Sequence, residues 1–377
     1  MTVPLTPGLP APFTPPVHES FQFPVSWLLD NAAAPIQFRA STEVARLPLR
    51  DPRQFGILPY GHRPALTIAF QQRPDGIWNG SMLSVPSPRA EHFQGIGTIT
   101  AVRRLLEYGW ERESPPLVQA RRTLFRLLAE DTDAAYLFEL APRGKPEPEV
   151  VLHGRALLRE AAAAVLAQAG YESDPRLRGA ALRLVERVDG FLRSPLAAKP
   201  FVRVGNQHVL APGASPPSIF YLAMLAHMPH FRSEHYDVME RLYAYLVQPM
   251  PRQEAVTLVG KKVVAEPQLV LGDPLPHRNA ADADLPAALY WLELMARLGM
   301  LRRNEGWAKL FERYLDDRDA SGVWRAPKRN VGTRTSNPFV WPAFPLEPHA
   351  TSDALSADVT FRLGLIARLM GRTIEPT

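Results

Sequence analysis

Two aspartates, Asp282 and Asp284, stand two positions apart, directly before the apolar run that begins at Leu285. A carboxylic acid held in a dry, apolar pocket keeps its proton at neutral pH and can deliver it to a substrate. The same residues also suit a simpler role. An aspartate that precedes a helix accepts hydrogen bonds from its free backbone N–H groups and complements the helix dipole. The pair is therefore a candidate proton donor or a candidate helix cap.

Histidines form a second group with possible chemistry, His227-Met-Pro-His230, followed closely by His235 and Asp237. Imidazole and carboxylate side chains bind zinc and exchange protons. Pro229 interrupts the helical spacing that a zinc site on one helix requires, so we expect capping and loop packing here rather than a metal. The absence of cysteine excludes disulfides and thiolate metal ligands. We expect no cofactor.

A third group of polar residues would come together only if consecutive helices form a ring. His92 lies shortly before a helix expected from Thr98, and a polar stretch precedes it. In a ring of helical hairpins the inner helices present one end to a central cavity, where polar side chains become pocket walls. The candidates for that cavity wall are Asn79, Ser81, His92, His153, Tyr221, Asp284, Tyr290 and Asp358.

A Gln-x3-Gly-x-Trp element indicates which architecture could form such a ring. It runs from Gln72 through Gly76 to Trp78, and a partial copy at Gly322 and Trp324 has Arg318 in place of the glutamine. The glycine permits a tight turn with positive φ after a helix, the indole covers the helix end, and the glutamine amide can bind open backbone groups.

This element resembles the QW motif of squalene-hopene cyclases and of the prenyltransferase and squalene-oxidase repeat proteins. The resemblance implies an α/α toroid of helical hairpins. Asp282-Ala-Asp284-Leu285 is similar to the Asp-x-Asp-Asp acid motif of class II terpene cyclases, but Leu285 replaces the final aspartate that would tune the acid. Protein prenyltransferases of similar fold have a cysteine in their zinc site, which this chain lacks.

Apolar spacing predicts the helices that would build the toroid. Helix-glycine junctions recur at Gly109, Gly170, Gly299 and Gly371, a periodicity that suits repeated helical units. The expected segments are 27–30, 41–47, 63–72, 98–108, 115–128, 155–169, 176–193, 218–226, 234–247, 285–298, 307–315 and 353–370.

Other segments interrupt the helical pattern. Residues 201–210 alternate around Gly205-Asn206 and predict a β-hairpin, as do residues 255–265 around Gly260. Residues 325–352 form a long loop rich in proline and aromatic residues, in which we expect Phe339, Trp341 and Phe344 to anchor a packed lid or partner surface.

Composition sets the outer limits. Residues 1–20 are rich in proline and predict an extended arm, and residues 21–377 predict a single toroid-like domain. The net charge is +5, and paired arginines such as Arg103-Arg104 and Arg121-Arg122 are expected on solvated helix faces. We therefore expect no nucleic-acid partner. No uncharged apolar run reaches the length of a membrane span, so we expect a soluble, cytoplasmic protein.

Two functions of different class fit this sequence. The first is a non-catalytic binding or structural protein that presents loops to a protein partner or to a neighbouring copy, through the arm and the loop 325–352. The second is an enzyme with a central cavity that acts on a polyprenyl-like or glycan substrate. The incomplete acid motif and the lack of a phosphate-binding glycine loop favour the first. A hollow centre would favour the enzyme, and a filled centre would favour the scaffold.

Overall fold

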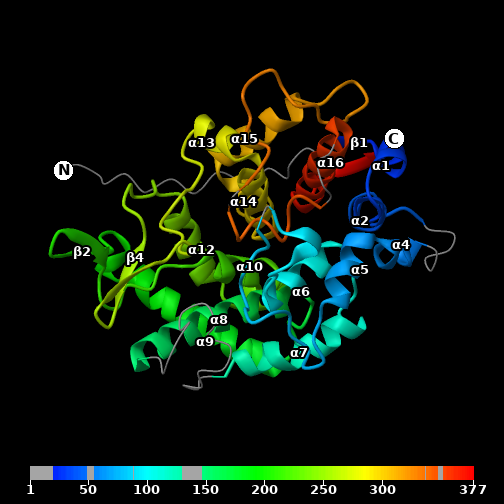
Figure 1. Cartoon of the computed structure of the whole chain (residues 1–377). Coiled ribbons are helices and arrows are strands. Elements are labelled where there is room, and N and C mark those ends of the chain that lie inside the picture. The colour runs from blue at the N-terminus through cyan, green and yellow to red at the C-terminus, as the bar shows by residue number, and fades with distance from the viewer. Residues whose placement is uncertain (1–19, 49–54, 88, 130–146, 336, 347–350) are drawn as a thin grey trace, which may run out of the picture.

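The structure, a computed structural model, describes residues 20–48, 55–87, 89–129, 147–335, 337–346 and 351–377. These residues are mainly helical and include three two-stranded sheets (Figure 1), which confirms the expected helical class. The predicted arm, residues 1–20, lies outside the described residues except for Ser20.

The helices fall where apolar spacing places them, with a few short additions. In chain order the described helices are α1 (Val25–Asn31), α2 (Ala34–Arg39), η1 (Ala40–Val44), α4 (Leu58–Gly61), α5 (Arg63–Phe70), η2 (Glu91–Phe93), α6 (Thr98–Glu107), α7 (Pro115–Leu127), α8 (Pro148–Gln168), α9 (Pro175–Arg193), η3 (Pro195–Ala197), α10 (Ile219–Ala226), α11 (Pro229–Glu234), α12 (Tyr236–Leu246), α13 (Arg278–Ala283), α14 (Leu285–Arg297), η4 (Leu301–Arg303), α15 (Glu305–Asp316) and α16 (Ser352–Leu369).

Local sequence fixes the start of these helices. In α9 the Asp174 carboxylate accepts a hydrogen bond from the Arg176 backbone N–H at 2.9 Å, and Pro175 occupies the first helical position. Helix α8 begins at Pro148, seven residues before the predicted start, because another proline opens it.

Glycines end four of the long helices. Gly109, Gly170, Gly299 and Gly371 all have φ between +73° and +86° and follow α6, α8, α14 and α16. After each of them, the next backbone N–H bonds to a carbonyl five residues earlier, as in Met300 to Met295 at 2.8 Å. This pairing satisfies carbonyls that a helix end leaves open. The glycine junctions predicted from the sequence are confirmed.

The long helices contact one another in succession. Helix α6 packs against α8, α8 against α10, α10 against α14, α14 against α16, and α16 against η1 and α1. Helices α7 and α9 flank α8, and α9 also contacts α12 (Figure 1). Apolar side chains from all of these helices belong to one continuous buried cluster.

Strands join distant parts of the chain or project from it. Strand β1 (Ser20–Phe23) pairs in parallel with β6 (Thr373–Pro376). Strands β2 (Phe201–Val204) and β3 (Gln207–Leu210) form one antiparallel hairpin, and β4 (Val256–Val259) and β5 (Lys262–Ala265) form another, which confirms both predicted hairpins. The two hairpins lie together at one side of the molecule, away from β1 and the C-terminal end (Figure 1).

Candidate functional site

The glutamine motif fastens three helices together. Trp78 is fully buried, and its indole N–H donates to the Ile68 carbonyl of α5 at 2.7 Å. Gly76 has φ +84°, and an added Cβ would lie 2.7 Å from a backbone oxygen of α7. The Gln72 amide donates to the Gly76 carbonyl at 2.9 Å and to the Pro116 carbonyl at 2.8 Å. The motif is thus a structural clamp.

The partial copy repeats this geometry. Gly322 has φ +83°, and Trp324 is fully buried. The Trp324 backbone N–H donates to the Thr360 hydroxyl of α16 at 2.9 Å, as the Trp78 N–H donates to the Thr98 hydroxyl of α6 at 3.0 Å. Arg318, in the glutamine position, donates to the Gln22 carbonyl at 3.2 Å and lies over the Phe21 ring.

A buried ion network lies between the long helices. The Glu107 carboxylate of α6 accepts from Arg39 at 2.6 Å and from Arg362 at 2.8 Å. Arg362 of α16 also donates to Glu293 of α14 at 2.7 Å, and Glu293 accepts from Arg297 at 2.9 Å. These side chains connect four helices with alternating charge.

The network holds its carboxylates in the ionised form. Burial would raise the pKa of Glu107, but the charges of Arg362 and Arg39 outweigh it and hold the pKa far below its ordinary value. Glu293 shows the same balance, with Arg362 and Arg297 lowering its pKa against the effect of burial. Neither group is arranged as a proton donor at neutral pH.

Part of the long loop covers this network. Residues 337–346 bring Val340, Ala343, Phe344 and Leu346 into the core, whereas Phe339 and Trp341 are only partly buried. The Ala343 carbonyl accepts a hydrogen bond from Arg362. Residues 337–346 of the predicted lid therefore form a packed plug against the ion network.

Arg103 and Arg104, expected on a solvated face, are instead buried. Arg104 donates to the backbone carbonyls of Trp341 at 3.1 Å, of Pro342 at 3.3 Å and of Pro345. The expectation was wrong because the loop packs over this face of α6. Of the pairs named above, only Arg121-Arg122 lies at a part-exposed surface.

The two candidate acids have different surroundings. Asp282 makes a two-bond ion pair with Arg313, 2.7 Å for each bond. Partial burial opposes its ionisation, but Arg313 and Arg329 lower the pKa of its carboxyl. Asp284 is half-buried and caps α14, accepting from the Ala287 N–H at 2.9 Å and from the Thr335 hydroxyl at 2.7 Å. Both arrangements suit the structural role of these residues.

The structure brings two of the expected wall residues into one cavity. Asp284 and Tyr290 line a cavity of about 370 Å³ at the N-terminal ends of α10 and α14. His153 lines a second cavity of about 160 Å³, where its Nε2 atom lies 2.9 Å from the Glu266 carboxylate. The two cavities share Gln268 and Leu269 as a common wall.

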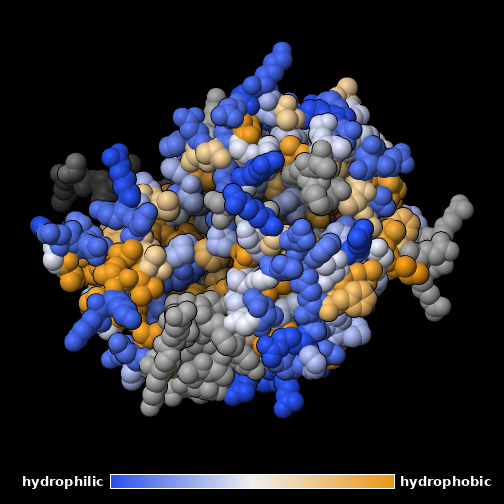
Figure 2. Space-filling model, viewed as in Figure 1, coloured by the Kyte–Doolittle hydropathy of each residue, from blue (hydrophilic) through white to orange (hydrophobic). Residues whose placement is uncertain are grey.

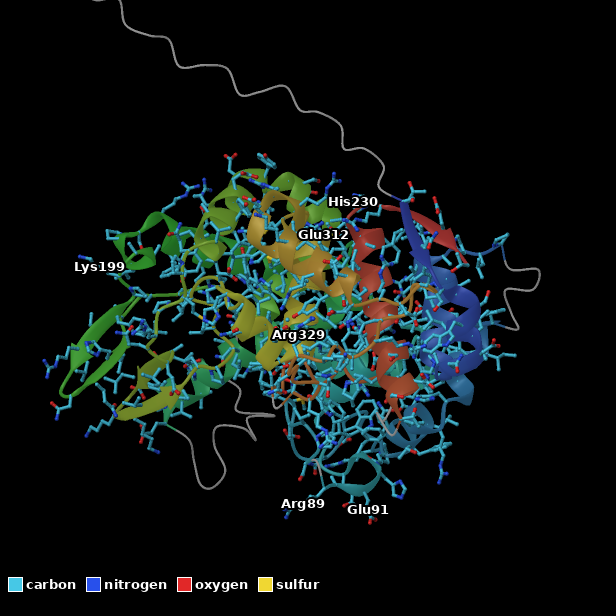
Figure 3. All side chains as sticks on the ribbon, turned by 90° about the horizontal axis from the view of Figure 1, so that it is seen from above. Arg89, Glu91, Lys199, His230, Glu312 and Arg329 are labelled. Carbon is cyan, nitrogen blue, oxygen red and sulfur yellow. The ribbon has the colours of Figure 1, made fainter. Side chains whose placement is uncertain are left out.

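The remaining candidates lie apart from these cavities. Asn79 and His92 are exposed, and Ser81 is half-buried near the start of α6, where its carbonyl accepts from the Thr98 N–H. Figure 3 labels Glu91, next to His92, at the outer edge of the molecule. Asp358 is fully buried and accepts from the Leu346 N–H at 2.6 Å, so it holds the plug.

Tyr221 of α10 is buried, His227 directly after this helix is half-buried, and both side chains are uncharged at neutral pH. Burial, and then the charge of Asp189, raise the pKa of Tyr221, whose hydroxyl has no hydrogen-bond partner among the described residues. Burial and the charge of Arg297 lower the pKa of His227 to about 4. Its Nδ1 atom lies 2.9 Å from the Ala223 carbonyl. The described residues contain no cluster of metal-binding side chains.

The two β-hairpins carry an exposed apolar surface that sequence reasoning did not single out. Leu258 and Val263 face each other across the β4–β5 ladder and are 45% and 44% exposed. Val202 and Val204 are also exposed, on strand β2 of the hairpin whose other strand, β3, contacts β4, and Met250 is exposed six positions before β4. Figure 2 shows this area in orange over β2 and β4, with hydrophilic residues around it. We call these five residues the hairpin surface.

Comparisons with known proteins identify no family for this chain, so the candidate sites rest on geometry. No helix in the described part of the chain is long and apolar enough to cross a membrane. No family model, no curated protein and no solved structure matches this chain.

Proposed function

We propose that the long helices close into an α/α toroid related to the prenyltransferase and squalene-oxidase repeat proteins. The succession of contacts from α6 through α8, α10, α14 and α16 to η1 supports this arrangement. So does the bond between Arg39, at the end of α2, and Glu107, at the end of α6. The shared geometry of Trp78 and Trp324 supports a repeated unit.

The interior of this toroid is proposed to be structural. The buried carboxylates Glu107 and Glu293 are each bound by arginines, and residues 337–346 pack against them. A catalytic acid would need a carboxyl with a raised pKa and access to substrate. These arginine-paired carboxylates favour a binding role over an enzyme that uses Glu107 or Glu293 as its catalytic acid.

We infer that the protein is a non-catalytic binding protein and that the hairpin surface receives its protein partner. The observation that carries this proposal is the exposed pair Leu258 and Val263 on adjacent strands, because clustered apolar side chains in water mark interaction sites. Each hairpin is a two-stranded sheet, and among the described residues no third strand pairs with it. An extended segment can therefore add to a free strand edge.

Charge around the hairpin surface indicates the chemistry of the partner. Residues 199–208 and 250–265 carry the exposed cations Lys199, Arg203, Arg252, Lys261 and Lys262, against one exposed acid, Glu254. Lys199 is labelled beside the hairpins in Figure 3. A second copy would bring like charges together, whereas an extended segment with alternating apolar and acidic residues complements the surface. We commit to a partner of that kind.

Paired substitutions test this function. The variant Leu258→Thr/Val263→Thr removes the exposed apolar pair. Threonine is β-branched and suits a strand, so the hairpin should still form. The matched control is Ile57→Thr/Phe70→Thr, which removes apolar residues that are 65% and 84% exposed elsewhere. The wild type and both variants are immobilised and incubated with a lysate of the cells that make this protein, and the proteins that bind each are compared by quantitative mass spectrometry. A protein that binds the wild type and the control but not the hairpin variant is then purified for calorimetry.

We expect the purified partner to bind the hairpin variant at least about tenfold more weakly than the wild type and the control. Its affinity should fall as salt is raised, because the surrounding charges are exposed. Equal binding to all three proteins would overturn the proposal. Adsorption to vesicles of phosphatidylcholine and phosphatidylserine, lost in the hairpin variant with no protein partner found, would replace it with a membrane role.

A further inference from the structure

The cavity of about 370 Å³ beside α14 is built mainly from apolar side chains. It lies between the N-terminal ends of α10 and α14, the segment 267–275 and the plug residues 337–340. Its apolar walls include Ile219, Leu269, Leu275 and Phe339. Met250, which is 47% exposed, lies at its margin, so the cavity reaches the surface there. Volume and lining are those of small-molecule sites.

Two buried hydrogen-bond donors line this cavity without acceptors. Trp291 is only 3% exposed, and its indole N–H has no hydrogen-bond partner among the described residues. The neighbouring Tyr290 hydroxyl accepts from Arg103 at 2.9 Å, which leaves its own hydrogen without an acceptor in the described part of the chain. Buried donors rarely remain unpaired in native proteins. Such a pair indicates a missing acceptor.

Charge limits what that acceptor can be. Asp284 is the charged residue in the described wall, and its two oxygens already accept from the Ala287 N–H and the Thr335 hydroxyl. An anionic ligand would be repelled by this carboxylate, and a cationic ligand would leave the two donors unsatisfied.

We propose that this cavity binds a small, uncharged, mostly apolar molecule through a carbonyl or ether oxygen. The oxygen accepts from Trp291 Nε1–H and from the Tyr290 hydroxyl, and the remainder of the ligand lies against Ile219, Leu269 and Phe339. No bond is made or broken. The cavity meets the hairpin surface only at Met250, and no variant in the two tests changes that residue. Because the two tests alter different residues, either proposal can fail without the other.

Matched probes and variants test the proposal on the full chain. The probes are 2-octanone, 1-octene without an acceptor oxygen, and octanoate with a negative charge, each measured by calorimetry. Trp291→Phe keeps an aromatic ring but removes the N–H, and Tyr290→Phe removes the O–H. Tyr245→Phe on α12, which is also buried and lies outside the cavity wall, is the control. In ¹⁵N-labelled protein, the indole resonance that disappears in Trp291→Phe identifies Trp291.

We expect 2-octanone to bind more tightly than either other probe and to move the Trp291 indole resonance downfield. Each of Trp291→Phe and Tyr290→Phe should weaken 2-octanone binding by roughly 2- to 10-fold, the effect of one hydrogen bond, and Tyr245→Phe should not. If either variant fails to fold, Ala287→Phe, which narrows the cavity, should abolish binding. Equal affinity for 1-octene, an unmoved indole resonance, or no binding of any probe would overturn the proposal.

Discussion

Two tryptophans in equivalent positions of the repeated motif differ in one hydrogen bond. Trp78 and Trp324 are both fully buried, and both donate their backbone N–H to a threonine of a following helix. The Trp78 indole also bonds to the Ile68 carbonyl, whereas the Trp324 indole N–H has no partner among the described residues. Comparing the two tryptophans therefore separates the contribution of ring packing to stability from that of the indole hydrogen bond.

Phenylalanine substitutions should expose this difference. Trp78→Phe leaves the Ile68 carbonyl without its donor, so it should lower the free energy of unfolding by about 0.5–1.5 kcal/mol more than Trp324→Phe does. Urea unfolding of both variants and the wild type measures it. Equal losses would mean that the indole bond contributes nothing. Trp78→Ala should cost more, about 3–5 kcal/mol, because it also removes the ring.

Single residues also show where sequence reasoning stops. Arg103 and Arg104 were read as part of a solvated helix face because charged residues are usually exposed. Their burial depends on a loop more than two hundred positions later, which no local pattern reveals. For the buried ion network, the signal available in the sequence was Glu293, a charged residue inside an otherwise apolar stretch. A charge in such a stretch predicts a buried partner of opposite sign.

At the scale of elements, helices were predictable because their signals are local. Apolar spacing and ending glycines placed α14 and α16 within one residue of their observed bounds. Both hairpins followed from alternation around Gly205 and Gly260. The parallel pair β1–β6 was missed because its strands are short and their partners lie far apart in the sequence.

Arg104 makes several of the hydrogen bonds that hold the plug, residues 337–346. Arg104 donates to carbonyls of Trp341, Pro342 and Pro345. Arg104→Met should release the plug and speed chymotrypsin cleavage after Phe339, which is followed by Val340 rather than proline, by about tenfold or more, because hydrogen bonds from a charged donor contribute about 1.5–3 kcal/mol. Mass spectrometry of the fragments follows the cut. The exposed Arg122→Met is the control, and an unchanged cleavage rate in Arg104→Met would refute the role of this residue.

Close packing between α16 and β1 gives another prediction. A Cβ at Gly364 would lie 2.3 Å from the Phe23 ring, which is fully buried. Gly364→Ala should therefore displace the ring and destabilise the fold by about 1–3 kcal/mol, although alanine favours helices. Gly190→Ala in α9, where no atom lies within 4 Å of the added Cβ, should be neutral or stabilising. Thermal unfolding of both variants compares them, and equal melting temperatures would contradict the packing argument.

For the whole molecule, the buried ion network links stability to pH. The pKa of Glu107 is lowered in the folded protein by Arg362 and Arg39 against the effect of burial, and its ordinary value is 4.5. Its contribution to stability is therefore complete above pH 4.5 and is lost as the pH falls toward the lowered folded pKa, because the unfolded chain takes up the proton first. Glu293 acts in the same direction.

Glu107→Gln tests this linkage. The variant should lose about 3–5 kcal/mol at pH 7, because two buried arginines lose their shared carboxylate. Its stability should also fall less steeply than that of the wild type between pH 4.5 and 3. Urea unfolding over pH 3–7 measures both effects. Parallel pH curves for the two proteins would show that Glu107 titrates alike in the folded and unfolded states.

The parallel pairing of β1 with β6 also bears on how this protein is made. Ser20 pairs with Thr373, so the buried rings of Phe21 and Phe23 find their strand partner only when the far end of this sequence has left the ribosome. Until then, this apolar segment remains unpaired and is free to bind chaperones or to form non-native contacts. Closure of so long a loop is entropically costly and slow. Translation speed, rather than sequence alone, can therefore set the yield of folded protein.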